Sequence, residues 1–397
     1  MVGRLELAFF GFVLLCMSIL SFFSHQQAFV ISRFRAPVPT FAVIFDAGST
    51  GSRVHVFQFD DRRQLIPVSG GLSAFQSVDG GLSGYASEPE SLRSGIASLA
   101  SFALRTTAQT SRARVFAFLG ATAGLRLLPD ETREALLGAA TNEISRVYPA
   151  ISGRVIDGQE EALYLLETVS FLTKDETAVV VDLGGASVQL AFRSPRPPLS
   201  EAERHFIQPR PDGSHVYLHS WLGFGLKAAR MRILQGKETS ACVRKSVEFS
   251  YGEERGHVKP GNGSCQEEVI DALSIGQGCA VGLQPCAFSG GWRGPHSSGK
   301  VYLFSFIFDV AVKLGLMAGQ SQAQLSVDDF VEASKRECDK DNDDEFLCID
   351  STFVAILISR GLGLPSDQQV TVANRLSYQG LSVEAAWPLG AALTQLH

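Results

Sequence analysis

One short pattern occurs twice in the chain, and this near-repeat constrains the fold more than any other feature of the sequence. Each copy has an apolar strand rich in β-branched residues, an aspartate near its end, a tight turn of small residues and a second apolar strand. The first copy covers 41–59 and contains Asp46, and the second covers 178–192 and contains Asp182. The two aspartates stand about one domain's length apart. The repeat therefore predicts two similar lobes facing each other, with both turns on one cleft.

Strands and helices alternate around this repeat. Apolar residues at three- and four-residue spacing predict helices, and short β-branched runs predict strands. We expect helices over 90–110, 130–147, 158–171, 326–337 and 350–360, and strands over 115–119 and 153–156. The proline-rich span 194–215 is expected to be a loop, and the glycine-rich span 242–300 to be irregular. Such alternation indicates an α/β fold.

Length and composition fit two domains. Hydrophobic residues make up 45% of the 397 residues and charged residues 19%, which is enough for large buried cores. The net charge of −6, without a basic stripe, argues against a nucleic-acid partner. We predict an N-terminal segment 1–39, a lobe I over 40–160 that is completed by 366–397, and a lobe II over 161–365 with a disulfide-bonded insertion at 242–300.

The N-terminal segment contains an apolar run over 7–23, preceded by Arg4. Its length is at the lower limit of the roughly 17–25 residues that cross a bilayer. We predict a signal anchor, which would attach the protein to a membrane through an N-terminal helix. The alternative is a cleaved signal peptide, although 26–28 supplies only one of the two small residues that a cleavage site needs. Either way the protein enters the secretory pathway, as a single-pass type II protein of the Golgi or cell surface, or as a secreted one.

The cysteines agree with an oxidising compartment. Six of them lie between Cys242 and Cys348, and no CxxC metal spacing occurs. We expect three disulfides, with Cys338 bonded to Cys348 and the four earlier cysteines paired among themselves. The alternative is a cytosolic protein with buried thiols. Asn262 begins the one glycosylation sequon, in a polar, glycine-containing stretch.

The two aspartate turns suggest phosphate chemistry. Successive backbone N–H groups in a Gly/Ser turn form a concave anion site, and glycine lets phosphate oxygens approach closely. A carboxylate beside each turn cannot bind phosphate directly, so it needs a cation between them, for which Mg²⁺ or Ca²⁺ is suitable. A structural hairpin would explain one such turn, but two copies at this spacing favour a binding site.

Glu160 and Glu161 begin the helix expected at 158–171. Hydrolysis of a phosphoanhydride needs a water in line with the bond and a base to take its proton. A glutamate at a strand-to-helix junction can be that base if it points into the cleft. The alternative is that acidic residues in a first helical turn only stabilise the helix dipole.

Other motifs are weaker. The acidic run 339–344 has the spacing of a calcium loop but lacks its sixth-position glycine and closing glutamate. His215 and His219 stand four residues apart without a third ligand, so we expect no zinc site. The absence of a Gly-Lys-Ser/Thr run argues against a P-loop enzyme.

Several motifs, in this order, resemble those of the apyrase family, the ecto-nucleoside triphosphate diphosphohydrolases, in the form of its plant members. They are DAGSTGSRVHVF (46–57), LGATAGLR (119–126), GQEE (158–161), DLGGASVQ (182–189), YLHSWLGFG (217–225), FSF (304–306), CID (348–350) and AWPLG (386–390). The resemblance covers about 41–393. It implies the two-lobed, ribonuclease-H-like fold of actin, Hsp70 and the sugar kinases, which agrees with the repeat.

The resemblance also implies roles for individual residues. Glu161 would be the general base, Ser187 and Gln189 would position the water, and Asp46 and Asp182 would hold the metal largely through its waters. No covalent phosphoenzyme is implied. The residues that would cradle the phosphates are Gly48, Ser49, Thr50, Gly51, Ser52, Arg53, Thr122, Gly184, Gly185 and Ala186.

The chain departs from the family pattern at four places. Ala162 replaces a glycine after the base, Leu166 an aromatic residue, and Ser170 an asparagine. Phe308 stands where a tyrosine is common, and it is our candidate for stacking on the nucleobase. The residues expected to carry the chemistry are intact.

We therefore expect apyrase-type hydrolysis of ATP, ADP, UDP or GDP to the monophosphate and phosphate, with Mg²⁺ or Ca²⁺ as cofactor. One alternative is a polyphosphate phosphatase of the same superfamily. Another is a lumenal nucleotide-binding protein that has lost catalysis, which the departures at Ala162, Leu166 and Phe308 would suit. Kinase- or chaperone-like use of ATP ranks lower, because Glu161 has no evident purpose there.

Overall fold

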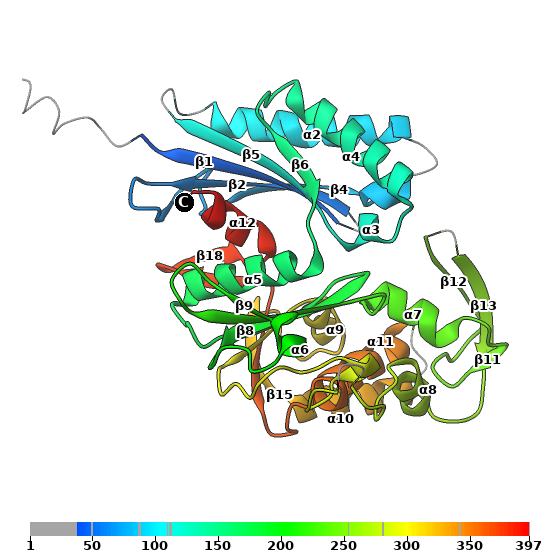
Figure 1. Ribbon diagram of the computed structural model, residues 1–397. Helices are drawn as coiled ribbons and strands as arrows, with labels where there is room; N and C mark the ends of the chain where they lie inside the picture. Colours follow the sequence, from blue (N-terminus) through cyan, green and yellow to red (C-terminus); the bar gives the residue numbers. More distant parts are fainter. Residues whose placement is uncertain are drawn as a thin grey trace, which may run out of the picture.

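The computed structural model describes residues 38–48, 51–85, 89–108, 110, 113–252, 254–279, 282–340 and 343–396. Most of the expected anchor segment, including the apolar run 7–23, lies outside the described residues. Within them, no helix has both the length and the apolar character needed to span a membrane. The expected two-lobed α/β fold is confirmed: two sheets lie one above the other, with helices above, between and below them (Figure 1).

The upper lobe is built on a mixed sheet of strand order β3-β2-β1-β5-β6, with β4 paired to β2. Its central strand β1 is buried on both faces, so its sequence is almost continuously apolar. Helices α2 and α4 cover the upper face (Figure 1). The bounds are β1 Thr40–Ala47, β2 Gly51–Phe59, β3 Leu65–Ile66, β4 Ala74–Asp79, η1 Leu82–Tyr85, α2 Pro89–Thr107, β5 Arg114–Ala121, α3 Ala123–Arg126, α4 Asp130–Ser145 and β6 Ser152–Val155.

The lower lobe has a seven-stranded sheet of order β15-β16-β14-β7-β8-β10-β9. Helices α7 to α11 cover its lower face and form the largest core of the protein. The bounds are β7 Val179–Leu183, β8 Ser187–Ser194, α6 Glu201–Arg204, β9 Ile207–Pro209, β10 His215–Leu222, α7 Leu226–Leu234, α8 Cys265–Ala272, η2 Phe288–Gly290, β14 Val301–Ser305, α9 Phe306–Lys313, β15 Gln322–Ser326, α10 Val327–Cys338, α11 Leu347–Ile356, η3 Leu357–Gly361 and β16 Gln369–Ala373.

Two helices join the lobes. Helix α5 (Gly158–Thr173) and helix α12 (Trp387–Gln395) pack against each other between the sheets (Figure 1). Their apolar side chains share one core with side chains of both sheets. The hairpin of β17 (Arg375–Tyr378) and β18 (Leu381–Glu384) belongs to the same layer. The lobes are therefore held in register by a common core rather than by a linker.

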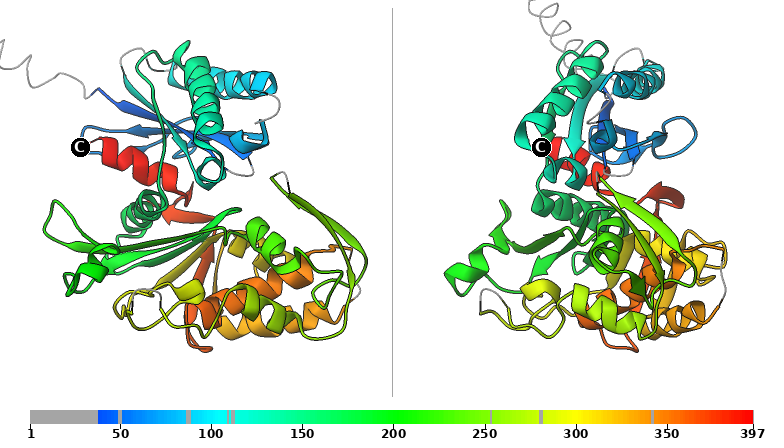
Figure 2. Two further views of the ribbon diagram at one scale, coloured as in Figure 1. Left: turned by 45° about the vertical axis from the view of Figure 1, so that its right-hand side comes forward. Right: turned by 90° about the vertical axis from the view of Figure 1, so that its right-hand side faces the viewer.

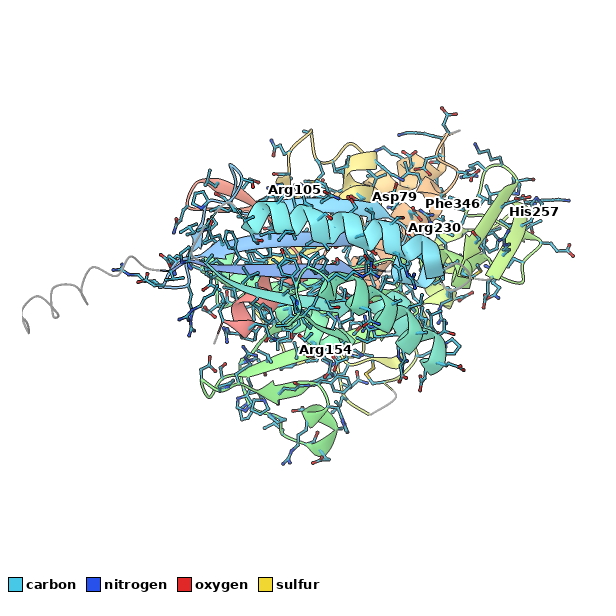
Figure 3. The ribbon with its side chains drawn as sticks, turned by 90° about the horizontal axis from the view of Figure 1, so that it is seen from above. Asp79, Arg105, Arg154, Arg230, His257 and Phe346 are labelled. Carbon is cyan, nitrogen blue, oxygen red and sulfur yellow. A yellow bond between two sulfur atoms is a disulfide. The ribbon has the colours of Figure 1, made fainter. Side chains whose placement is uncertain are left out.

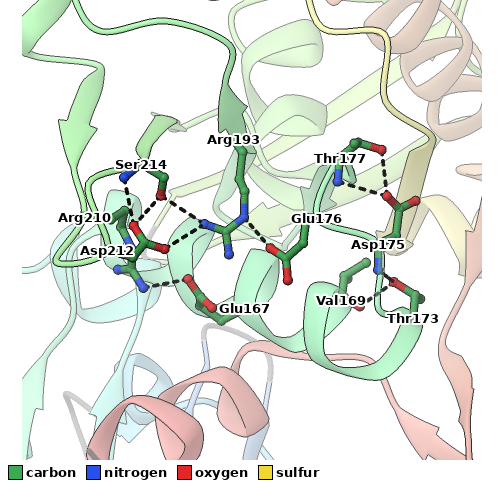
Figure 4. Close-up of polar contacts among 10 residues, drawn as sticks. All are labelled: Glu167, Val169, Thr173, Asp175, Glu176, Thr177, Arg193, Arg210, Asp212 and Ser214. Carbon is green, nitrogen blue, oxygen red and sulfur yellow. Dashed lines mark hydrogen bonds and ion pairs between the residues drawn. The ribbon is translucent and has the colours of Figure 1, made fainter.

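Ion pairs fasten α5 to the lower lobe at the end remote from the helix N-terminus (Figure 4). Glu167 accepts a 2.7 Å bond from Arg210, which precedes β10. Arg193 on β8 pairs with Glu176, just beyond α5, and with Asp212. These contacts are partly exposed, so each adds little stability by itself. They connect the C-terminal half of α5 and the segment after it to β8 and to the turn before β10.

The cysteine pairing is confirmed. Disulfides join Cys338 to Cys348, Cys242 to Cys265 and Cys279 to Cys286. The span expected to be irregular also holds a projecting hairpin of β12 (Val247–Tyr251) and β13 (Glu254–Pro260), with β11 (Thr239–Ser240) beside β13 (Figure 2). His257 lies on this hairpin, at one end of the molecule seen from above (Figure 3).

The expected helices and strands between the two repeats are all present. The span 194–215 is more ordered than expected, because it contains α6 and β9. The chain also stays in the lower sheet to Ala373, later than the boundary at 365, because β16 pairs in parallel with β14. The short edge strands escaped notice because two or three residues carry no periodic pattern.

Candidate active site

Both aspartate hairpins open onto one cleft between the lobes. In each, the glycine two residues after the aspartate closes the turn by donating to a carbonyl three residues on: Gly48 to Gly51 at 3.1 Å, and Gly184 to Ser187 at 2.9 Å. The repeat seen in the sequence is thus a repeat in geometry. The cleft has a volume of about 240 Å³, and both Asp46 and Asp182 line it. It lies at the carboxyl ends of β1, β5, β7 and β14, where α/β proteins usually bind ligands.

The two carboxylates are nearly inaccessible, with 8% of Asp46 and 9% of Asp182 exposed. Burial raises the pKa of both, opposed by Arg53 at Asp46 and by Ser305 at Asp182. The Asp46 charge further raises the pKa of Asp182, so the two carboxylates interact electrostatically. Within the described residues, Oδ1 of each is buried without a hydrogen-bond donor. Paired buried oxygens in need of positive charge suit a hard divalent cation.

Glu161 points from the first turn of α5 into this cleft. The helix begins with a capping box between Asp157 and Glu160, and Glu160 also binds Arg154 at 2.6 and 2.7 Å. The adjacent glutamates therefore have different partners: Glu160 faces β6 and Glu161 faces the cleft. The helix-dipole explanation accounts for Glu160 but not for Glu161.

The carboxylate of Glu161 is buried and surrounded by charge. Its Oε2 accepts bonds from Arg126 Nη2 at 2.6 Å and from Gln189 Nε2 at 3.0 Å. Burial raises the pKa of Glu161 to about 8; the Arg126 charge opposes this rise, and the Asp182 and Asp46 charges add to it. A carboxyl group with a pKa near the working pH can both accept and release a proton.

Gln189 connects the base to the lower hairpin. Besides Glu161, its Nε2 lies 2.7 Å from Ser187 Oγ and 3.3 Å from Ser220 Oγ. Its Oε1 is buried without a partner among the described residues. Glu161 and Ser187 line the cleft, and Gln189 is buried behind them and bonds to both. The three groups form one polar line that can hold a water molecule beside the base.

The lower turn is braced from behind by the segment before and within α7. The carbonyls of the turn accept bonds from N–H groups of this segment: Gly184 from Leu226, Gly185 from Lys227 and Ala228, and Ala186 from Gly223. Helix α7 is in turn fixed to α11, because Arg230 binds Asp350 and lies 4.5 Å from the ring centre of Phe346 (Figure 3). With the carbonyls occupied, the amide side of the turn is available for an anion.

Most of the expected site residues line the cleft: Asp46, Gly48, Arg53, Thr122, Glu161, Asp182, Gly184, Gly185, Ala186 and Ser187. Ser49 and Thr50 lie outside the described residues. Ser52 and Phe308 do not reach the cleft. The Ser52 hydroxyl faces Gly80 at 3.4 Å, because alternate residues of a strand point to opposite faces and Arg53 occupies the cleft face. Gly51 contributes its carbonyl to the turn rather than a cleft surface.

Phe308 is 7% exposed and packs in the core of the lower lobe. The aromatic ring of α9 that lines the cleft is Phe306, the first residue of that helix. The other departures from the family pattern are also buried: Ala162 and Leu166 lie in the core between the lobes, and Ser170 is 4% exposed. These departures alter packing around the site rather than its polar surface. Asn262 is exposed, in a bend before α8.

Sequence reasoning missed Arg126, which binds Glu161, and seven residues that line the cleft: His55, Ser305, Phe306, Asp309, Asn374, Glu384 and Trp387. Ser305 lies in the quoted motif 304–306, and its backbone has a positive φ of 60° at the end of β14. Such strain in a residue other than glycine is concentrated at functional sites. Arg126 is the last residue of the quoted motif 119–126, and this motif was the sequence signal that could have identified it.

Comparisons with known proteins agree with this geometry. The chain matches the GDA1/CD39 (nucleoside phosphatase) family over residues 38–397. It is 33% identical to "Probable apyrase 2" of Oryza sativa subsp. japonica, covering 89% of this chain and 85% of that protein. It is 31% identical to "Ectonucleoside triphosphate diphosphohydrolase 5" of Bos taurus, covering 97% and 96%. Among solved structures, nucleoside triphosphate hydrolases from Neospora caninum align with a TM-score of 0.65 at 14% identity, covering 95% and 96%. The chain therefore belongs to the GDA1/CD39 nucleoside phosphatase family.

Proposed function

We propose that the protein is an apyrase-type phosphohydrolase that removes the terminal phosphate of nucleoside triphosphates, diphosphates or both, down to the monophosphate. The names of its relatives, apyrase and ectonucleoside triphosphate diphosphohydrolase, support this substrate class. The observation that carries the proposal is a buried glutamate, Glu161, held by Arg126 and Gln189 beside two buried aspartates. A nucleotide would lie across the cleft with its phosphates between the two turns.

Asp46 and Asp182 would hold the cofactor, Mg²⁺ or Ca²⁺, largely through its water ligands. Their buried, unpartnered Oδ1 atoms fit such a cation. When bound, it would offset the charge of the phosphates and make the terminal phosphorus easier to attack. The donor set is all oxygen, which suits both ions.

The residues of the chain supply the rest of the chemistry. Gln189 and Ser187 would hold the attacking water, and Glu161 would take its proton as the water oxygen bonds to the terminal phosphorus. The bond from phosphorus to the bridging oxygen breaks, and the nucleotide leaves with one phosphate fewer. No protein atom bonds to phosphorus, so the serines act as hydrogen-bonding groups.

The phosphates would be bound by the Arg53 guanidinium, the Thr122 hydroxyl and the turn amides of Gly185 and Ala186. The amides of Gly48 and Gly184 already donate to carbonyls within their turns, so these glycines would instead leave room for the phosphates. We retain Ser49 and Thr50 as proposed phosphate ligands on the basis of the motif alone. For the nucleobase we propose Phe306 instead of Phe308, because Phe306 is the aromatic ring of α9 that lines the cleft. The polar and apolar groups that border this ring would then determine which nucleobase the protein prefers.

We further propose that the protein works in the secretory pathway, with Asn262 glycosylated and the 1–39 segment acting as a type II anchor or a cleaved leader. Three disulfides and an exposed sequon support this setting. Protease protection in microsomes and sensitivity to an endoglycosidase would test it. A protein that stays in the cytosol without a glycan would contradict it.

The decisive test is phosphate release by the purified protein from ATP, ADP, UDP, GDP and polyphosphate. Glu161→Gln should remain folded and lose about 10²–10⁴-fold in kcat, the usual contribution of a general base. Glu160→Gln is the matched control: it changes the adjacent glutamate, which binds Arg154 instead, and should keep most of the activity.

Three results would refute the proposal. Equal activity of Glu161→Gln and wild type would remove the assigned base. Preference for polyphosphate over every nucleotide would point to a polyphosphate phosphatase. Tight nucleotide binding without phosphate release would identify a non-catalytic binding protein.

A further inference from the structure

The catalytic glutamate is held from both lobes at once. Oε2 of Glu161 accepts one bond from Arg126, at the end of α3 in the upper lobe, and one from Gln189, on β8 in the lower lobe. Both side chains of the ion pair are largely buried, with 13% of Arg126 and 11% of Glu161 exposed. The two contacts therefore connect the lobes at Glu161, and the ion pair is only weakly screened by solvent.

The surroundings leave space for this guanidinium. Gly158, the first residue of α5, lies against Arg126 and Ser220. A Cβ at this glycine would come within 2.5 Å of Arg126 Nη1 and 2.1 Å of Ser220 Oγ, so no other residue fits without moving one of them. The φ of Gly158 does not require glycine, which leaves close approach as the reason for it.

Arg126 is also the cation that balances the local charge. The carboxylates of Asp46 and Asp182 act on Glu161 from the two hairpins, and both favour its protonated form. The neutral groups of Gln189 and Ser220 complete its polar surroundings. Among the described groups that shift its pKa, Arg126 is the one that favours the charged form. A base must be charged to accept a proton, so this contact bears directly on catalysis.

We propose that Arg126 is the positioning residue of the general base: it favours the charged form of the Glu161 carboxylate and holds that carboxylate in place for the attacking water. Arg126 does not itself touch the substrate. Because Arg126 and Gln189 belong to opposite lobes, the common core that holds the lobes in register also keeps both contacts to Glu161 in place. The inference rests on the proposed function and assigns a role that function leaves open.

The test compares two arginines that bind neighbouring glutamates of the same helix. Arg126→Gln removes the partner of Glu161, and Arg154→Gln removes the partner of Glu160. For Arg126→Gln we expect kcat to fall while KM for the nucleotide changes little. The acid limb of the kcat/KM–pH profile should move upward by about 1–3 pH units, the size of the effect that an adjacent arginine has on a carboxylate. Arg154→Gln should leave the profile in place.

Two further variants separate positioning from a merely structural role. Arg126→Lys keeps the charge but loses the forked geometry, so its acid limb should stay near that of wild type while kcat falls. Arg126→Ala should regain activity when guanidinium ion is added at non-denaturing concentration, and Arg154→Ala should not. Thermal melting of each variant shows which are folded, and Arg126→Lys carries the test if Arg126→Gln is not.

An unshifted acid limb in folded Arg126→Gln would overturn the inference, as would equal shifts in Arg126→Gln and Arg154→Gln. If Arg126→Gln does not fold, the test falls to Arg126→Lys. The inference would be overturned if the acid limb of Arg126→Lys moved by about 1–3 pH units, the shift expected for loss of the charge. Wild-type protein that releases no phosphate would overturn the proposed function and this inference with it.

Discussion

The two aspartate hairpins have the same turn but different partners across it. In the upper hairpin Asp46 lies opposite Arg53, whose Nη1 is 3.3 Å from its carboxylate. In the lower hairpin Asp182 lies opposite Gln189, whose amide turns instead to Glu161 and Ser187. One pattern thus carries a charged partner in one lobe and a neutral one in the other. We infer that the lobes divide the work: the upper hairpin binds phosphate charge, and the lower one serves the water and the base.

Because both hairpins carry an aspartate at the same place, we expect the largest loss of activity when either aspartate is changed. Asp46→Asn and Asp182→Asn should each lower kcat/KM by about 10³-fold, because each removes a charge that no neighbour replaces. Activity should respond to added Mg²⁺ or Ca²⁺ less steeply in both variants than in wild type. Phosphate release measured across a metal titration checks this. If only one variant is impaired, the two hairpins do not share one cation.

The partners should differ in which kinetic constant they change. Gln189→Ala should lower kcat by about 10²-fold with little effect on KM, because it removes a group that orders the water for the transition state. Arg53→Gln should instead raise KM about 10- to 100-fold, the worth of a hydrogen bond to a charged group. Steady-state kinetics with ADP and ATP distinguish the two. If both variants changed the same kinetic constant, the proposed division of work between the lobes would be wrong.

The base predicts a pH effect of smaller size. Burial raises the pKa of Glu161 to about 8, and below that value the group is protonated and cannot accept the proton of water. Activity should therefore rise with pH, by about tenfold per unit along the acid limb. The limb should lie above the ordinary range of glutamate and below about 8, since a bound cation offsets the Asp46 and Asp182 charges. A profile that is flat between about pH 5 and 8 would contradict this assignment.

The sequence predicted the hairpins because each is a local pattern: strand, turn and strand follow within twenty or so residues. It misplaced Ser52, although the alternation of side chains along a strand could have assigned that hydroxyl to the far face. It could not place Phe306 over Phe308, because that choice depends on where β14 ends and α9 begins, at the strained Ser305. Nor could it pair Arg126 with Glu161, since their contact depends on how the lobes pack.

The brace behind the lower turn gives the smallest predicted effect. A Cβ on Gly225 would lie 2.3 Å from Ala186 N and 2.4 Å from Gly185 C, and both of these atoms are backbone. The φ of −65° at Gly225 suits any residue, so the cost of Gly225→Ala comes from this overlap alone. We expect a loss of about 1–3 kcal/mol in the free energy of unfolding, as for other overpacked sites, and a fall in kcat of several-fold.

Gly236→Ala is a control at a glycine whose Cβ would meet nothing, although its φ of 76° makes it a strained position. It should destabilise the fold without lowering kcat in the protein that remains folded. Gly225→Ala should lower kcat even when corrected for the folded fraction, because it moves the lower turn while the upper turn keeps its place. Equal corrected kcat values for the two variants would mean that catalysis tolerates displacement of the lower turn, and the lower hairpin would then lose its assigned part in holding the water.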